Sequence, residues 1–254
     1  MNDRRVTASV LIIGNEILSG RTQDLNLQYI AQHLNTRGVV VSEAHVIPDV
    51  HTTIVNSVND ARRRHDYVLT TGGIGPTHDD ITAECVAAAF NLPLVVDATI
   101  EKRIRSRPAP PDIMENRLRM ARIPKGAELI DNLTGGPPGF SIENVYVMAG
   151  IPSVLQAMLP TIDFDGGSII RSCSVTAYMG ESEISRELGT IQEQYGSGID
   201  LGSYPFNRDG RFGTTLVMRG TDTNQLSNML EDVKQAIRNR GQEPGEVSYD
   251  WDRS

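Results

Sequence analysis

Apolar runs alternate with helical patterns along the amino-terminal part of the chain, and this alternation constrains the fold more than any other feature. The runs Val6–Ile13, Val39–Ile47 and Tyr67–Thr71 have the length and residue types of buried strands. Apolar residues at helical spacing occupy the segments between them, at 24–34 and 52–64. Strands and helices that alternate this closely form right-handed crossovers and a parallel sheet with helices on both faces. The sequence therefore predicts an α/β fold.

The rest of the chain divides into a continuation of this domain and a second, smaller one. Further elements predicted for the first domain are a helix through residue 89, an extended piece at 91–96, helices at 98–106 and 112–121, a strand at 145–148 and a helix at 152–159. The composition changes near Asp163–Gly167, so the first domain spans residues 1–166. Residues 167–240 predict a small α+β domain with strands at 168–179, 199–204 and 212–219 and helices at 181–194 and 223–240. The composition of residues 241–254 predicts a mobile tail.

The overall charge and the two cysteines limit the classes of partner and compartment. The chain has 24 basic and 32 acidic side chains, a formal net charge of −8, which argues against a nucleic-acid partner because such binding depends on neutralising phosphates. No run of about 18 apolar residues is present and the first apolar stretch is too short for a signal peptide, so we expect no membrane partner. Cys85 and Cys173 form no C-x-x-C motif or Cys/His cluster. These features predict a cytoplasmic protein.

Basic residues nevertheless gather in one segment. Between Glu101 and Lys125, eight Lys or Arg residues stand against three acids. Such a segment either faces an anionic small molecule or forms a solvated helix pair, of which the second is the more common. The sequence alone leaves both open.

Four loops are predicted at one edge of the sheet, where parallel strands end and ligands bind. They span residues 14–26, 47–53, 71–82 and 149–153. The third carries Gly72, Gly73 and Gly75, whose missing side chains let backbone N–H groups approach an anion. It is neither a Walker A loop nor a dinucleotide fingerprint, because no G-K-[ST] follows and the G-x-G-x-x-G spacing is absent. The loop therefore indicates an anion site of another kind.

Carboxylates gather in the same loops. They are Glu16, Asp24, Asp49, Asp79 and Asp80. Part of this set has a structural explanation, because Thr77 and Asp80 fit a capping box in which Thr77 is the N-cap of the next helix. A cap does not explain five acids from three loops beside glycines that suit an anion. Since carboxylates repel phosphate, the combination predicts Mg²⁺ or a similar hard cation between them and a phosphate or pyrophosphate.

Several segments together form a set of motifs in a fixed order. They are Gly14–Gly20 with Asp24 and Asn26, Gly72–Thr82, Asn132 with Gly139–Phe140, Gly150–Ser153 and the turn Gly202–Phe206. The set resembles the MoaB/Mog-like molybdopterin-binding superfamily, and within it the amino-terminal portion of the CinA competence/damage-inducible proteins. The resemblance covers most of the chain but not the carboxy-terminal amidase domain of full-length CinA proteins, before which this chain is expected to end.

The resemblance implies a three-layer αβα fold with a mostly parallel sheet, a nucleotide or molybdopterin ligand and an oligomeric assembly. It also implies activities. CinA-type domains are associated with metal-dependent cleavage of pyrophosphates such as ADP-ribose or FAD, and Mog-type relatives with adenylylation of molybdopterin. We expect a homodimer, with a trimer as the alternative, because the segment 98–121 reads as amphipathic contact or lid helices.

Functional residues are carried over at the positions that match the motifs. The resemblance implies a catalytic and metal-binding role for Glu16, Asp49 and Asp80, with Mg²⁺ or a transition ion as the cofactor. It implies ligand binding by Gly72, Gly73, Gly75, Asp79, Thr82, Asn26, Asn132, Gly150 and Ser153. The leading hypothesis is a metal-dependent hydrolase of a nucleotide pyrophosphate. The alternatives are molybdopterin binding without turnover and adenylyl transfer in molybdenum cofactor synthesis.

Overall fold

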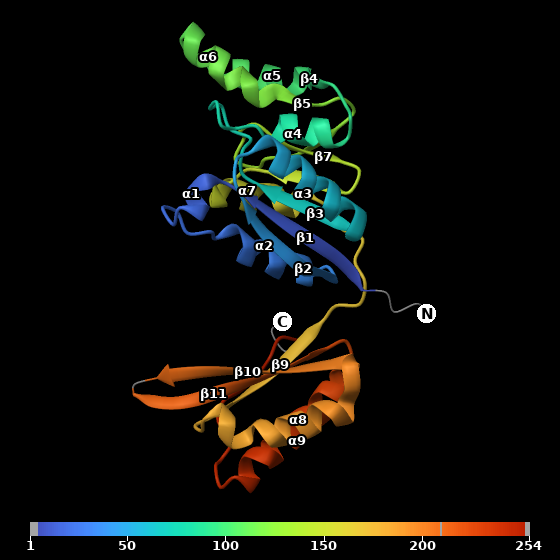
Figure 1. The fold of residues 1–254 in the computed structure, drawn as a ribbon, viewed down its shortest axis with the longest axis vertical. Helices are drawn as coiled ribbons and strands as arrows, with labels where there is room; N and C mark the ends of the chain where they lie inside the picture. The colour runs from blue at the N-terminus through green and yellow to red at the C-terminus, as the bar shows by residue number, and fades with distance from the viewer. Residues whose placement is uncertain (1–4, 209, 252–254) are drawn as a thin grey trace. The chain divides into compact units, whose positions relative to one another are not determined.

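The computed structural model describes residues 5–208 and 210–251, which form two compact units (Figure 1). The first unit ends at Gly167 and the second begins at Ser168. Each unit has its own sheet and its own buried hydrophobic cluster. No helix within the described residues is long and apolar enough to cross a membrane.

The first unit is built on a six-stranded sheet in the order β2-β1-β3-β8-β7-β6. The strands are β1 (Val6–Ile13), β2 (Val39–Ile47), β3 (Tyr67–Thr71), β6 (Glu128–Ile130), β7 (Gly139–Ile142) and β8 (Val145–Met148). β1 pairs in parallel with β2 and β3, and β3 pairs in parallel with β8. The strand β7 is antiparallel to β8 and to β6. This arrangement confirms the predicted mostly parallel sheet.

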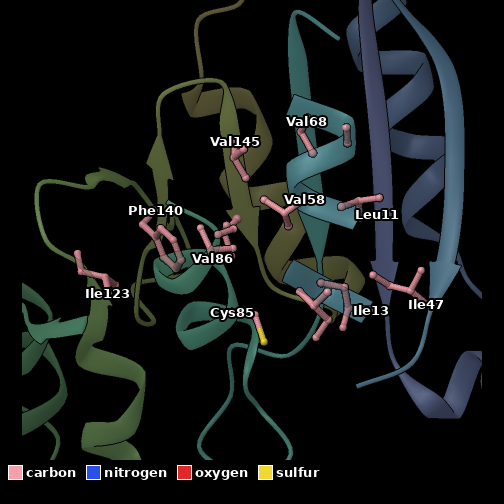
Figure 2. Packing of buried hydrophobic residues seen from close by; sticks show 14 of the residues in the cluster. Leu11, Ile13, Ile47, Val58, Val68, Cys85, Val86, Ile123, Phe140 and Val145 are labelled. Carbon is pink, nitrogen blue, oxygen red and sulfur yellow. The ribbon is translucent and has the colours of Figure 1, made fainter. Parts of the chain in front are cut away.

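Helices cover both faces of this sheet. Its helices are α1 (Asn15–Leu18), α2 (Asn26–Asn35), α3 (His51–Arg64), α4 (Thr82–Ala89) and α7 (Pro152–Met158), with a short 3-10 helix η2 (Leu159–Thr161). Alternate residues of β1 point to opposite faces: Val10 and Ile12 join the cluster with α2 and α7, while Leu11 and Ile13 join the cluster with α3 and α4 (Figure 2). The result is the predicted three-layer αβα architecture.

An outer segment packs beside α4 in the first unit. It consists of β4 (Leu94–Val96), α5 (Ala98–Arg105), α6 (Pro111–Leu118), the 3-10 helix η1 (Arg119–Ala121) and β5 (Arg122–Pro124). Asp97 caps α5 by accepting hydrogen bonds from the N–H groups of Thr99 and Ile100, both at 2.9 Å. The buried side chains Ile100 and Ile104 attach α5 to the cluster under α3 and α4.

The second unit is a four-stranded antiparallel sheet in the order β10-β11-β9-β12, packed against two helices. Its elements are β9 (Arg171–Ala177), α8 (Glu181–Tyr195), the 3-10 helix η3 (Gly196–Gly198), β10 (Ile199–Arg208), β11 (Arg211–Gly220), α9 (Thr223–Asn239) and β12 (Val247–Tyr249). These agree with the predicted small α+β domain in element type and order, except for β12.

The prediction of a mobile tail over residues 241–254 is wrong for β12. Val247 and Tyr249 pair antiparallel with Val175 and Cys173 of β9, and Trp251 packs against the core of the second unit. The free edge of β9 supplies the hydrogen bonds that a short segment lacks on its own. Residues 252–254 lie outside the described residues.

A truncation tests the independence of the first unit. A fragment of residues 1–167 is expected to fold alone, because both hydrophobic clusters that surround the six-stranded sheet lie within it. Circular dichroism with thermal unfolding measures this against the full chain. A fragment without helical signal or a cooperative transition would contradict the division.

Both cysteines are expected to resist thiol reagents in the native protein. Burial raises the pKa of the Cys85 thiol to about 12 and that of Cys173 to about 11, so the reactive thiolate is scarce in the folded state. At about pH 8, where an unperturbed thiol is partly ionised, a chromogenic disulfide should label the native chain very slowly and the urea-unfolded chain quickly at both positions. Rapid labelling of the native protein would contradict this.

Candidate functional site at the carboxyl edge of the sheet

The four predicted loops do meet at one edge of the sheet. β1, β2, β3 and β8 run in parallel, so the loops that follow Ile13, Ile47, Thr71 and Met148 lie at the same edge. Backbone hydrogen bonds join neighbouring loops: Gly14 donates to the Ile47 carbonyl at 3.1 Å, and Gly72 donates to the Met148 carbonyl at 3.2 Å. The edge is therefore one connected structure.

Asn26 links three parts of this sheet edge. Its side-chain amide donates to the Thr71 hydroxyl at 2.8 Å and to the Gly150 carbonyl at 2.7 Å, so the first turn of α2 holds the ends of β3 and β8 together. The same residue is buried, and its Oδ1 has no hydrogen-bond partner among the described residues. A buried acceptor left unpaired costs about 1–3 kcal/mol. A donor on a ligand or a water molecule would remove that cost.

The glycines permit close backbone packing at this edge. Gly72 has φ +105°, and a Cβ there would lie 2.1 Å from the Ile13 carbonyl oxygen. Gly73 has φ +67°, and its Cβ would lie 2.1 Å from the Thr82 hydroxyl, which itself donates to the Gly72 carbonyl at 3.0 Å. Gly150 packs on Gly72, with its Cβ position 3.2 Å from the Gly72 Cα. Packing alone therefore requires glycine at positions 72 and 73.

Three consecutive N–H groups of the loop are available to a ligand. In the part of the chain that the structure describes, the backbone N–H groups of Gly73, Ile74 and Gly75 have no hydrogen-bond acceptor, and all three residues are partly exposed. Successive unpaired N–H groups in a glycine-rich loop are a common way to bind phosphate or carboxylate oxygens. The loop therefore has the donors that an anion site needs.

Asp80 shapes the loop in a different way from the predicted capping box. α4 begins only at Thr82 and has no side-chain cap, so the prediction that Thr77 caps this helix is wrong. The Asp80 carboxylate instead accepts hydrogen bonds from the Thr77 N–H, at 2.8 Å, and from the Thr77 hydroxyl. The Thr82 N–H is taken by the Gly73 carbonyl at 2.9 Å, which keeps the chain in a loop up to that residue.

The adjacent Asp79 is exposed and ionised at neutral pH. The nearby Thr77 hydroxyl, followed by the backbone N–H of Asp79 itself, lowers the pKa of this carboxyl below its usual range, although the hydrogen bond of that hydroxyl goes to Asp80.

The other predicted carboxylates also have structural contacts. Asp49 accepts a hydrogen bond from the Asn15 N–H at 2.9 Å, which ties the loop after β2 to α1. Asp24 accepts from the N–H groups of Asn26 and Leu27 at 3.3 and 3.0 Å, and so satisfies two N–H groups of the first turn of α2, whose N-cap position is Leu25. Glu16 is exposed, with its carboxylate folded over the Gly14 backbone.

The described residues contain no group of three or more His, Cys, Asp or Glu that could hold a metal ion. The predicted ligands Glu16, Asp49 and Asp80 therefore do not form a preassembled site, and the carboxylates of Asp49 and Asp80 already accept backbone N–H groups. The residues as placed do not fit a resident metal ion. A metal role for them stays a prediction.

The remaining predicted residues lie in two places. Gly150 and Ser153 are exposed in and after the loop that follows β8. Asn132 is buried in the loop between β6 and β7, where its side chain accepts from Thr134 and donates to the Pro137 carbonyl at 2.9 Å. This loop shares the sheet edge, because β6 runs parallel to β8 through the intervening β7. No hydrogen bond between described residues joins Asn132 itself to the four loops.

Thr71 is a site residue that the sequence interpretation missed. Besides accepting from Asn26, its hydroxyl donates to the Ala149 carbonyl at 3.1 Å, so one side chain at the end of β3 contacts both α2 and the loop after β8. A signal was present, since Thr70 and Thr71 are polar residues that end an apolar run. Both are buried in the structure.

Comparison with known families identifies the first unit. Residues 9–163 match the family described as "Probable molybdopterin binding domain", and this match covers more than half of the chain. The chain belongs to this molybdopterin-binding domain family. Residues 170–244 match a second family, described as "FAD synthase, middle domain". The match to the first family contains all four loops of the carboxyl edge and Asn132.

Relatives of known name support the same assignment. A CinA-like protein of Salinibacter ruber is 28% identical over 251 residues, which are 92% of this chain and 59% of that protein. A CinA-like protein of Syntrophus aciditrophicus is 32% identical over 218 residues, 77% of this chain and 50% of that protein. This chain thus spans little more than half the length of these relatives. The crystal structure of CinA from Thermoplasma acidophilum is 31% identical, with a TM-score of 0.56 over 62% of this chain and 96% of that one.

A pair of glycine substitutions tests the packing of the loop. Gly20 and Gly73 have similar angles, φ +70° and +67°, but a Cβ at Gly20 meets nothing within 4 Å whereas one at Gly73 meets Thr82. Gly20→Ala is expected to lower the free energy of unfolding by about 1 kcal/mol through backbone strain. Gly73→Ala is expected to cost roughly 1–3 kcal/mol more through overpacking. Urea unfolding measures both, and equal losses would show that the contact with Thr82 has no energetic weight.

Proposed function

We propose that the first unit binds a phosphorylated ligand at the carboxyl edge of its sheet and hydrolyses a nucleotide pyrophosphate such as ADP-ribose or FAD. The observation that carries this proposal is the run of three unpaired N–H groups at Gly73, Ile74 and Gly75. Such donors stabilise negative charge that develops on phosphoryl oxygens during hydrolysis, without any reorganisation of the loop.

The surroundings of this loop support a ligand of nucleotide or pterin type. It lies where open α/β sheets place their ligands. The unpaired Oδ1 of buried Asn26 would accept a hydrogen bond from an amino or hydroxyl group, which bases, riboses and pterins all carry. The N–H groups of the glycine loop would thus bind the phosphate, and the Asn26 side chain would bind the polar part of the same molecule.

Hydrolysis needs a water molecule and charge neutralisation as well as binding. Water adds to one phosphorus and the bridging P–O bond breaks, so ADP-ribose gives AMP and ribose 5-phosphate, and FAD gives AMP and FMN. Mg²⁺ is often held by one or two carboxylates together with substrate phosphates. An ion that arrives with the pyrophosphate therefore requires no preassembled set of ligands. Glu16 and Asp79 are exposed carboxylates of this edge that could contact such an ion.

Molybdopterin binding, with or without adenylyl transfer, is the alternative, and the description of the matching family names molybdopterin. The two differ in what the purified protein holds. A fluorescent pterin released on denaturation would favour the alternative, and AMP would favour the hydrolase. The homodimer, with a trimer as the alternative, stays a prediction.

An assay of AMP release tests the hydrolase directly. The chain of 254 residues with ADP-ribose or FAD and Mg²⁺, Mn²⁺ or Co²⁺ is expected to release AMP. Glu16→Gln is expected to slow this about a hundredfold or more, the lower end of the range for losing one catalytic carboxylate. The Glu16 side chain makes no hydrogen bond to another described residue, since Ser19 and Thr22 donate to the Glu16 backbone carbonyl, so its replacement is expected to leave the fold intact.

Glu128→Gln is the matched control, because Glu128 is an exposed carboxylate on β6 away from the four loops. Its AMP release should equal that of the unchanged protein. The hydrolase proposal fails if no AMP is released under any of the ions, or if both variants retain full activity.

A further inference from the structure

A cavity of about 430 Å³ lies between α5, α6 and the loop after β6, outside the four loops described above. Its lining includes Arg103, Arg107, Arg117, Ile104, Met120 and Pro137. The volume is within the range of small-molecule sites, roughly 300–1,000 Å³. None of Glu16, Asp49, Asp80 or the loop glycines Gly72, Gly73 and Gly75 lines it.

The three arginines are held in place mainly by backbone carbonyls. Arg107 donates to the Gly135 carbonyl at 2.9 Å, and Arg117 donates to the Arg107 carbonyl at 3.3 Å. Arg103 donates to the Gly136 carbonyl at 3.2 Å, and its pair with Asp131 at 3.3 Å is the one ion pair that the three arginines form with described residues. A carbonyl orients a guanidinium without cancelling its charge, so three positive groups face one carboxylate.

This excess charge has a physical consequence. None of the residues lining the cavity is acidic, and like charges gathered at one place repel each other. The site is therefore expected to gain stability from any anion that enters it. Each guanidinium has five N–H donors in a planar fork. Arg107 and Arg117 each use one of them here and Arg103 uses three, so donors remain for a phosphate group.

The apolar part of the lining indicates that the ligand has an apolar part as well as a negative charge. Ile104 is buried, Met120 is half-buried, and Pro108 and Pro137 add rigid apolar surface. A planar heterocycle packs well against methionine and proline, and it stacks on guanidinium planes. Charge and apolar surface together match a molecule with a phosphate at one end and a planar ring at the other.

We propose that this cavity is a binding site for a nucleoside phosphate, with the phosphate on Arg107 and Arg117 and the base against Met120 and Pro137. The proposal does not depend on hydrolysis at the carboxyl edge, since the two sets of residues are different. It also gives a role to the basic segment 101–125, for which the sequence left an anionic ligand and a solvated helix pair open.

Calorimetric titration of the full chain with AMP tests the proposal. Arg107→Gln and Arg117→Gln are each expected to raise the Kd for AMP about tenfold or more, because each removes a charged hydrogen-bond donor from the phosphate. Adenosine, which lacks the phosphate, should bind the unchanged protein more weakly than AMP. At the same AMP concentration, AMP should also raise the Tm of the unchanged protein more than that of either variant.

Arg105→Gln is the matched control. Arg105 is the last residue of α5, two positions before Arg107, and has the same charge, but it pairs with Glu101 and does not line the cavity. Its Kd for AMP should be that of the unchanged protein. Arg107 is exposed, so its replacement leaves the core intact, and circular dichroism confirms the fold of each variant.

Two results would overturn the proposal. One is the absence of AMP binding by the unchanged protein at millimolar concentration. The other is equal AMP affinity in the Arg105, Arg107 and Arg117 variants, which would place any bound AMP elsewhere. If Glu16→Gln abolishes hydrolysis while Arg107→Gln leaves AMP affinity unchanged, the carboxyl-edge function stands and the cavity proposal alone fails.

Discussion

β1 lies between β2 and β3 and pairs with both in parallel. Parallel neighbours cannot be joined by a tight hairpin, so the chain must return through a helix after each strand. Every crossover then leaves its strand at the same edge, and the loops after β1, β2, β3 and β8 are brought together there. The position of the candidate site follows from this pairing, as does the coverage of both faces by helices.

The residues of that edge serve stability and ligand binding at once. Gly72 and Gly73 are required by close packing, and Asp24, Asp49 and Asp80 each accept backbone N–H groups. Among the described residues of this edge, the N–H groups of residues 73–75 and the Oδ1 of Asn26 have no hydrogen-bond partner within the protein. These unused groups, more than the number of acids, mark where a ligand gains interactions that the protein does not already provide.

The antiparallel strands β7 and β6 extend the parallel sheet beyond β8 and carry the loop of residues 131–138 to the same edge. The carbonyls of that loop accept hydrogen bonds from Arg103 of α5 and from Arg107, which follows α5, and both arginines come about thirty residues earlier in the chain. A basic cavity results from elements that have no local relation in sequence. Its charge is concentrated because carbonyls, and only one carboxylate, position the guanidinium groups.

The sequence by itself determined the alternation of strands and helices, the small second unit and the edge at which the loops meet, since hydrophobic periodicity and glycine placement are local properties. Tertiary structure decided the rest. β7 and β12 are short segments without their own periodic signal, and each forms because a neighbouring strand offers a free edge. Asp80 bonds to Thr77 within a loop instead of in a helix, because the Gly73 carbonyl takes the Thr82 N–H. The positions of the carboxylates and of the arginines relative to one another depend on long-range packing. A local sequence pattern does not contain that information.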